Sequence, residues 1–423
     1  MTTAARTPGP GRVPAVPAVP AVPAVPAVPA PTEPPGPVPA AVKAGNPGLA
    51  QAFAGLPRVV DLLAARAEEH DRDACFPYQG IEVVHDAGLL TLTVAERHGG
   101  AGAGLADAVR VLTELGRGDP SVALVTAFTL LVHARQARTS PWPEAVYADL
   151  LADSVRGPAL VGVLGPEEVL GRGGADDAAR SAGTVGVTAR RGEGGWLLTG
   201  CEPGVAGAEA LAWMVVTART EGEQPGEGVF LVQGDTPGVQ VEPTWDQLGL
   251  RATASHDVVF EDAEVGDDAV VRLDADGADG DPLDRAWSDL ALPAVYLGVA
   301  RAARSWLVRA LRPVLLDGDG QLQAAVGSIE VELTAAEELL LALARGVDEG
   351  SPDAPLRTAA GRIVATRSAV SVVEQAVALS GGAGLSRAHP LERHLRDVLH
   401  ARGHGLREHE LLAEAGRQAL RSR

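Results

Sequence analysis

Three stretches with different hydrophobic spacing follow one another along this chain, and their order limits the folds open to it. Residues 48–156 and 274–423 carry apolar side chains at the i, i+3, i+4 spacing of packed helices. Between them, residues 157–273 contain short runs typical of strands, separated by Gly, Pro and Asp. We therefore predict an α+β, mainly α fold with an N-terminal helical domain, a middle antiparallel barrel or sandwich and a C-terminal helical bundle.

The first 47 residues differ from the rest of the chain. Residues 13–30 read VPAVPAVPAVPAVPAVPA. Pro at every third position removes backbone donors and fixes φ, which excludes helix and sheet and favours extended polyproline II. We expect residues 1–47 to form a disordered Pro/Ala/Val-rich leader. A tail or tether is a simpler interpretation of it than a binding segment.

Charge and cysteine usage restrict the partners and the compartment. Asp and Glu outnumber Lys and Arg by 55 to 36, and the resulting charge of -19 repels nucleic acid and anionic lipid. Cys75 and Cys201 lack metal-ligand spacing, so we predict neither a disulfide nor a metal site. No apolar run approaches the roughly 20 residues that span a bilayer, and Pro interrupts the N-terminus where a signal peptide is apolar. A cytoplasmic protein follows by elimination.

Five phrases in order resemble the acyl-CoA dehydrogenase superfamily. They are ERHGGAGAG (96–104), ELGRGDPSVAL (114–124), GGWLLTG (194–200), WDQLGLRATASHDVVFEDAEV (245–265) and LSGGAGLSRAHPLERHLRD (379–397). The resemblance covers nearly everything after about residue 48. It implies an N-terminal helical domain, a central β-barrel and a C-terminal four-helix bundle, with a flavin between the barrel and the bundle.

The resemblance also implies which residues would hold the flavin. Arg312 and Gln323 have the eleven-residue spacing of an Arg and a Gln that reach the cofactor of a neighbouring subunit. An Arg can pair bidentately with a pyrophosphate. Gly381 and Gly382 match glycines that let the backbone approach the cofactor. The resemblance thus implies FAD, with FMN as the alternative, and a homodimer or homotetramer. A solvated helix-end cation and a simple helix stop are the competing interpretations.

The groups that would perform dehydrogenation fit less well. The resemblance implies a carboxylate base at Ala388 or Ser288, and neither residue can serve as one. Asp289 is adjacent to Ser288, but reaching the same position requires a rotation of about 100° around the helix. Gly204 and Ala206 also occupy the place of the aromatic and hydroxyl groups that cover the flavin ring in relatives.

A second branch of the superfamily takes reduced flavin from a reductase and uses oxygen to hydroxylate a substrate. Its members end in a phrase that residues 392–397 (ERHLRD) resemble, followed by a His at the place of His404. A His beside the flavin can exchange a proton at neutral pH. A helix-end histidine between two glycines is an equally good interpretation. His404 and Asp289 are therefore the candidate catalytic residues.

Three functions remain open from the sequence. The first is a flavin-dependent oxidoreductase acting on an acyl thioester of CoA or a carrier protein, or on a related small molecule. The second is a monooxygenase that uses reduced flavin and oxygen and is supplied by a flavin reductase. The third is a non-catalytic homologue that has lost flavin and serves as a scaffold or partner subunit.

Overall fold

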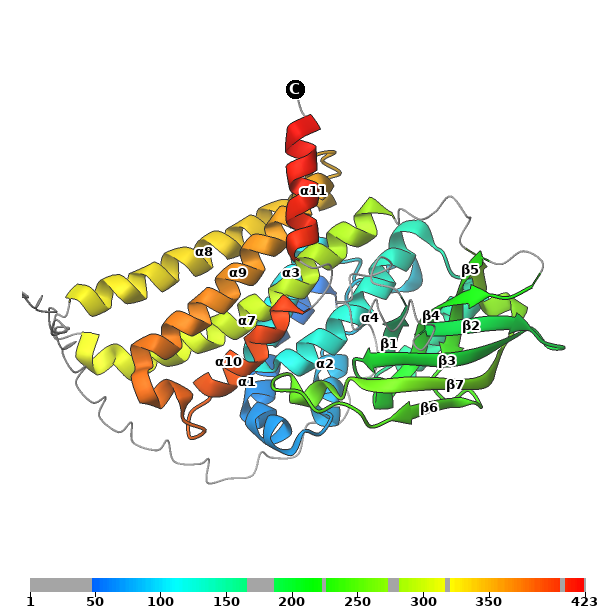
Figure 1. The fold of residues 1–423 in the computed structure, drawn as a ribbon, viewed down its shortest axis with the longest axis horizontal. Coiled ribbons are helices and arrows are strands. Elements are labelled where there is room, and N and C mark those ends of the chain that lie inside the picture. The colour runs from blue at the N-terminus through cyan, green and yellow to red at the C-terminus, as the bar shows by residue number, and fades with distance from the viewer. Residues whose placement is uncertain are drawn as a thin grey trace, which may run out of the picture. The chain divides into compact units, whose positions relative to one another are not determined.

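The computed structural model describes residues 48–165, 186–222, 226–272, 281–315, 320–403 and 408–421. Within these residues, helices precede and follow a block of strands (Figure 1). The predicted α+β, mainly α fold is therefore confirmed. The predicted leader, residues 1–47, lies outside the described residues.

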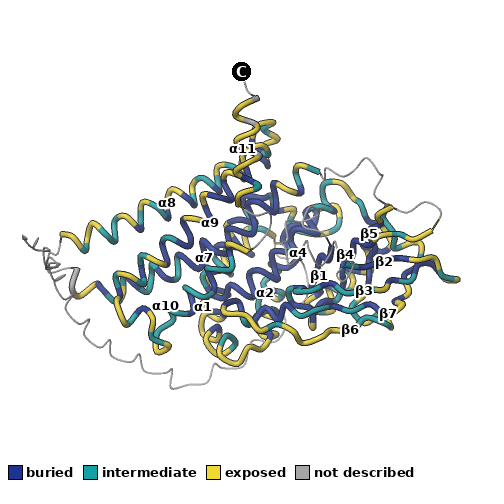
Figure 2. Tube along the Cα trace, viewed as in Figure 1, coloured by how far each residue is buried: buried dark blue, intermediate teal, exposed yellow. Residues whose placement is uncertain are grey.

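The helices of the N-terminal part surround one buried helix. Their bounds are α1 Leu49–Asp73, α2 Tyr78–Asp86, α3 Leu105–Gly118, α4 Pro120–Thr139 and α5 Glu144–Arg156. The Asp119 carboxylate accepts hydrogen bonds from the amides of Ser121 and Val122 and so caps the start of α4. Most residues of α4 are buried, which makes it the core of this part (Figure 2).

The strands form one mixed sheet of eight. Their bounds are β1 Leu160–Leu164, β2 Gly186–Arg191, β3 Trp196–Val205, β4 Leu211–Thr220, β5 Gly226–Gln233, β6 Val239–Glu242, β7 His256–Val265 and β8 Val270–Arg272. The ladder of described strands runs β6-β7-β3-β2-β4-β5-β8. The strands β1 and β2 both pair in parallel with β4, whereas the sequence predicts antiparallel pairing throughout. They share one edge of β4, β1 along its first half and β2 along its last residues.

Long helices make up the C-terminal part. Their bounds are α7 Pro282–Leu315, α8 Gly320–Asp348, α9 Ala354–Ser380, α10 Leu391–Leu399 and α11 Glu408–Arg421. Residues 349–353 separate α8 from α9. Helix α7 contacts α3, α4, α8, α9 and α10, so its middle is buried on all sides (Figure 2). This explains why its apolar residues follow no single face.

Two glycines allow α3 and α7 to approach closely. A Cβ added at Gly116 would lie 2.3 Å from the carbonyl oxygen of Val295, and one added at Gly298 would lie 2.3 Å from the carbonyl oxygen of Thr113. Any larger residue would collide with the backbone of the other helix. This crossing joins the N-terminal helices to the C-terminal bundle.

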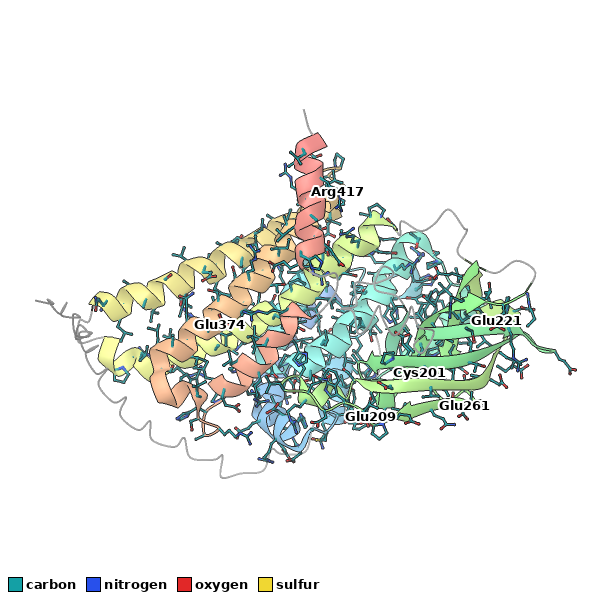
Figure 3. All side chains as sticks on the ribbon, viewed as in Figure 1. Cys201, Glu209, Glu221, Glu261, Glu374 and Arg417 are labelled. Carbon is teal, nitrogen blue, oxygen red and sulfur yellow. The ribbon has the colours of Figure 1, made fainter. Side chains whose placement is uncertain are left out.

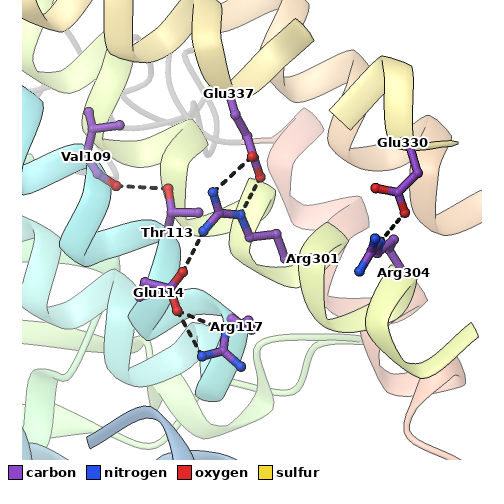
Figure 4. A network of polar contacts seen from close by, with 8 residues as sticks. All are labelled: Val109, Thr113, Glu114, Arg117, Arg301, Arg304, Glu330 and Glu337. Carbon is purple, nitrogen blue, oxygen red and sulfur yellow. Dashed lines mark hydrogen bonds and ion pairs between the residues drawn. The ribbon is translucent and has the colours of Figure 1, made fainter. Parts of the chain in front are cut away.

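An ionic network joins α3, α7 and α8 beside this crossing (Figure 4). The Arg301 guanidinium on α7 pairs with Glu114 on α3 and with Glu337 on α8, its Nη2 lying 2.9 Å from Glu337 Oε2. Arg117 donates from Nε to the other oxygen of Glu114 at 2.9 Å. Because all four side chains are partly solvated, we assign the network to the geometry of the crossing more than to its stability.

Asp348 caps a helix that lies far away in sequence. Its carboxylate oxygens accept hydrogen bonds from the amides of Leu105 (2.7 Å) and Ala106 (2.9 Å) at the start of α3. We expect Asp348→Ala to lower the free energy of unfolding by about 1 kcal/mol, the usual effect of losing a cap. Urea unfolding measures this, and Asp348→Asn, which keeps one acceptor, should lose less. Equal stability of all three proteins would contradict the assignment.

The sequence predicts no apolar run long enough to span a bilayer, but one helical segment of the structure has the length and composition of a span. Of the described residues, the segment 354–385 would pass as a span by length and composition. Half of its most apolar window is buried inside the chain, and α9 packs on α7 and α8. The core helix of a soluble protein passes the same test, so this segment supports no membrane assignment.

Candidate functional site

The four predicted cofactor residues lie at one end of the C-terminal bundle (Figure 1). Arg312 is in the last turn of α7, Gln323 is in the first turn of α8, and Gly381 ends α9. Helices α8 and α9 are consecutive, similar in length and packed together, so the end of α9 returns to the start of α8. The eleven-residue spacing of Arg312 and Gln323 therefore places both residues at the same end of the bundle, and both side chains are exposed.

The glycine turn at this end leaves room for a ligand. Gly381 has a φ of +57°, which disfavours any residue with a side chain. A Cβ added at Gly381 or Gly382 would meet nothing within 4 Å, so the chain covers neither backbone unit on that side. Whether a flavin approaches this turn stays a prediction. Neither of the two cavities described for this structure is lined by Arg312, Gln323 or these glycines.

The residues at the end of β3 that are expected beside a flavin ring also leave open space. Gly204 has a φ of +64°, and its amide donates to the Asp257 carboxylate at 3.0 Å. A Cβ at Gly204 would meet nothing within 4 Å, and Ala206 is only partly buried. The described chain therefore supplies no aromatic wall at these two positions.

The predicted candidate Asp289 lies inside the contact between α7 and α9. Its side chain is 2% exposed and accepts hydrogen bonds from Thr358 Oγ1 (3.1 Å) and Arg362 Nη1 (3.3 Å). Burial raises the pKa of Asp289, and the positive charge of Arg362 opposes that rise. The neighbouring Ser288 hydroxyl donates to the backbone carbonyl of Asp284. Asp289 lines neither described cavity, so a substrate would have to separate two helices to reach it.

The phrase at residues 392–397 anchors α10 to distant parts of the chain. Arg396 pairs with both oxygens of Asp71 on α1, at 2.9 and 2.6 Å, and donates to the Leu248 carbonyl. Asp397 Oδ1 accepts from the amide of Leu250 at 2.7 Å. Burial raises the pKa of Asp397 to about 7. These contacts hold α10 against the loop that precedes β7.

Two buried groups on α10 have unused hydrogen-bonding atoms. Arg393 is 7% exposed, and its Nε and Nη1 have no partner in the described part of the chain. The adjacent His394 is 6% exposed, and its Nδ1 also lacks one there. Burial, followed by the charges of nearby arginines, lowers the pKa of His394 well below its usual value. His394 is therefore neutral at physiological pH.

The other predicted catalytic residue, His404, lies outside the described residues. The chain that leads toward it forms a short 3₁₀ turn at His400–Arg402. There the His400 ring lies 5.8 Å from the ring of Trp245, measured between centroids. Burial lowers the pKa of His400.

The larger described cavity, of about 480 Å³, lies away from the glycine turn. It opens to solvent and is lined by η1 (Glu96–His98) and the turn after it, the start of α3, the end of α4, the start of α7 and the end of α8. Its polar lining includes Arg97, Arg138 and Asp348. No local pattern in the sequence predicts this cavity, because its walls come from segments more than 200 residues apart.

The cysteines and acidic residues form no described metal centre. Cys201 lies on β3, as labelled in Figure 3, and Cys75 follows α1. Both thiols are free, and burial raises the pKa of each. Within the ranges that the structure describes, no group of three or more His, Cys, Asp or Glu residues could hold a metal ion.

Comparison with known proteins gives consistent matches along the chain. Models of the N-terminal, middle and C-terminal domains of acyl-CoA dehydrogenase match residues 59–137, 173–263 and 290–408. The putative acyl-CoA dehydrogenase YdbM of Bacillus subtilis is 32% identical over 81% of this chain and 89% of its own length. The amino sugar nitrososynthase DnmZ of Streptomyces peucetius is 30% identical over 81% and 86%.

A solved structure with bound flavin is also similar. KijD3 in complex with FMN and dTDP-3-amino-2,3,6-trideoxy-4-keto-3-methyl-D-glucose superposes with a TM-score of 0.75. It is 29% identical in sequence, and the match covers 88% of this chain and 92% of that chain.

Proposed function

Because the chain belongs to the acyl-CoA dehydrogenase family, we propose that it is a flavin-dependent oxidoreductase that uses reduced flavin and oxygen to oxidise a small molecule. One observation carries the choice of monooxygenase over dehydrogenase. Dehydrogenation needs a carboxylate within reach of the substrate carbon. Asp289, the carboxylate adjacent to one implied position, is instead enclosed by Thr358 and Arg362 between two helices.

The relatives support this proposal. DnmZ is named as a nitrososynthase, and KijD3 holds FMN together with a nucleotide-linked amino sugar. Both resemble this chain over more than four fifths of its length. We therefore favour FMN over FAD as the cofactor, and a small molecule over an acyl thioester as the substrate.

The residues of this chain would then divide between holding the flavin and moving protons. Arg312 would pair with the flavin's phosphate at the bundle end, and Gln323 would donate to it. The open backbone at Gly381 and Gly382 would admit the cofactor without a steric clash. When bound, reduced flavin supplies the two electrons that convert oxygen into one product oxygen atom and water. His404 would exchange a proton with the substrate.

Assembly and supply of electrons follow from the same proposal. The family resemblance implies that Arg312 and Gln323 would serve the flavin of a neighbouring subunit, which would require a homodimer or homotetramer. A separate flavin reductase would provide reduced flavin. We place the protein in the cytoplasm, where such a reductase and its reductant occur.

A second candidate function is acyl-CoA dehydrogenation. The 32% identity with YdbM, a putative acyl-CoA dehydrogenase, favours it. Bleaching of bound flavin by an acyl-CoA without oxygen would support it. Oxygen uptake and an oxygenated product with added reduced flavin would support the monooxygenase instead.

Flavin titration of the purified full chain tests the common part of both functions. We expect FMN fluorescence to be quenched on binding and Arg312→Ala to weaken the affinity at least about tenfold, the effect of losing one charge-assisted hydrogen bond. Arg367→Ala is the matched control, because Arg367 is an exposed α9 arginine paired with Glu408. If the natural chain binds neither oxidised nor reduced flavin, the chain is not a flavin enzyme and the scaffold function of the sequence analysis takes its place.

A further inference from the structure

The loop between β6 and β7 is held against α10 by two adjacent residues of that helix. This β6–β7 loop comprises residues 243–255. Arg396 Nη1 donates to the Leu248 carbonyl at 2.9 Å, and Asp397 Oδ1 accepts from the Leu250 amide at 2.7 Å. Both bonds reach backbone groups of the loop, so they fix the path of its chain and not the direction of a side chain.

The loop approaches α10 closely and is locally strained. A Cβ added at Gly249 would lie 2.2 Å from the Arg396 carbonyl oxygen, so this approach requires glycine. Leu250 and Ala254 have φ angles of +50° and +44°, in the left-handed region that residues with a side chain seldom adopt. Such a conformation persists only where surrounding contacts hold it. The bond from the Leu250 amide to Asp397, which is 3% exposed, is one of these contacts.

The same loop holds the end of β3. The Thr253 carbonyl accepts from the amide of Gly207 at 2.8 Å. Within the loop, the Leu250 carbonyl accepts from Thr253 Oγ1 at 2.8 Å, from the Thr253 amide at 3.0 Å and from Trp245 Nε1 at 3.0 Å. A continuous series of hydrogen bonds therefore runs from Asp397 through Leu250 and Thr253 to Gly207.

Helix α10 lies between two segments of the candidate site. It follows the glycine turn, which is the 3₁₀ helix η6 (Gly381–Leu385), and the chain after it continues through η7 (His400–Arg402) toward His404. Residues 204–207, at the end of β3, form a third segment, the one expected beside a flavin ring. Asp397 therefore connects the end of β3 to the helix that carries the other two segments.

From these contacts we propose that Asp397 is a positioning residue of the candidate flavin site, which sets the end of β3 relative to α10 through the β6–β7 loop. The inference rests on the proposed function, since the segments that Asp397 connects act together only when a flavin lies between them. Arg396 pairs with both oxygens of Asp71 and so holds α10 to α1. Removing the Asp397 carboxylate should therefore release the loop while α10 stays in place.

Hydrogen–deuterium exchange of the full chain tests this coupling without any ligand. Asp397→Ala removes the acceptor of the Leu250 amide. Gly249→Ala forces the loop away from α10 and removes no polar group or charge, so it keeps the test valid if Asp397→Ala unfolds. In both variants we expect the amides of residues 204–207 to exchange at least about fivefold faster, measured relative to peptides of α8, because the loop loses a hydrogen bond that holds it. Unchanged relative exchange in both variants would show that the proposal is wrong.

FMN titration of the same variants tests the positioning role itself. We expect Asp397→Ala and Gly249→Ala to bind FMN at least about fivefold more weakly than the natural chain. Asp397→Asn keeps an acceptor oxygen opposite the Leu250 amide and should recover most of the affinity, which a role in net charge would not allow. Faster exchange with natural FMN affinity would make Asp397 an anchor of the fold alone and overturn its positioning role.

A glycine of α1 supplies the matched control. A Cβ added at Gly55 would meet nothing within 4 Å, so Gly55→Ala should match the natural chain in exchange at residues 204–207 and in FMN affinity. A natural chain that binds no flavin would overturn the proposed function and the positioning role with it. The exchange measurement would still decide whether Asp397 is coupled to the end of β3, so the two failures are distinguishable.

Discussion

Arg362→Met is expected to lower the free energy of unfolding by about 3–5 kcal/mol, because it leaves the buried carboxylate of Asp289 without its cation. In the natural chain both side chains are almost inaccessible, 6% exposed for Arg362 and 2% for Asp289. After the substitution, the remaining close donor is the Thr358 hydroxyl. Arg285 Nε lies 4.0 Å away on a half-exposed side chain, so it compensates only in part. Urea unfolding at neutral pH measures the loss.

The double variant Arg362→Met/Asp289→Leu tests whether the loss of stability comes from the missing ion pair itself or from the buried, unpaired carboxylate. Removing both charges should recover most of the stability, because an apolar pair of similar volume often replaces a buried ion pair without loss. Arg367→Met is the matched single control on the same helix. Its partner Glu408 is half exposed, so it should change the free energy of unfolding by less than about 1 kcal/mol. An Arg362→Met protein as stable as that control would show that Asp289 does not need a cation.

The layered fold is predictable because hydrophobic period is a local property. Helices α7, α8 and α9 and most strands fall where the spacing of apolar residues changes, and the Asp119-Pro120 pair marks the start of α4. The parallel pairing of β1 and β2 with β4 is not visible in that spacing. It depends on which strands share an edge of β4, and side-chain alternation along each strand is the same for parallel and antiparallel neighbours.

Residue spacing locates the candidate flavin end for a similar reason. Arg312 lies in the last turn of α7 and Gln323 in the first turn of α8, so their short separation in sequence places both at the same end of the bundle. The surroundings of Asp289 are decided by α9, more than 60 residues later, and no local signal reports that Arg362 will face it. The cavity at Arg138 cannot be predicted from local sequence patterns either, because five separate segments line it.

The phrase at residues 392–397 shows how a motif can carry two meanings. Its resemblance to an oxygen-using branch suggests chemistry, whereas its contacts are those of an anchor. Arg396 holds Asp71, and Asp397 holds the amide of Leu250. These contacts fix the position of the end of α10, from which the chain continues toward His404. The motif can therefore accompany an active site without supplying its reacting groups.

Acidification should expose a large pH-dependent loss of stability at His133. This side chain is fully buried on α4, with Nδ1 3.0 Å from the Tyr147 hydroxyl, and burial lowers its pKa to about 4. The unfolded chain binds a proton at about pH 6.5, so it binds more protons than the folded chain between that pH and about 4. The stability contributed by neutral His133 is complete above pH 6.5. It falls by about 1.4 kcal/mol per pH unit within the window, about 3 kcal/mol in all.

Comparison with His133→Phe isolates this contribution from the general effect of protonating carboxylates. The variant loses the contact with Tyr147 at every pH, but its free energy of unfolding should fall less steeply between pH 6.5 and 4 than that of the natural chain. His394, also buried with a lowered pKa, remains in both proteins and cancels from the difference. The exposed His409 on α11 supplies the control, since His409→Gln should follow the natural curve. Parallel curves for His133→Phe and the natural chain would mean that His133 is charged as easily in the fold as in water, which a fully enclosed imidazole does not allow.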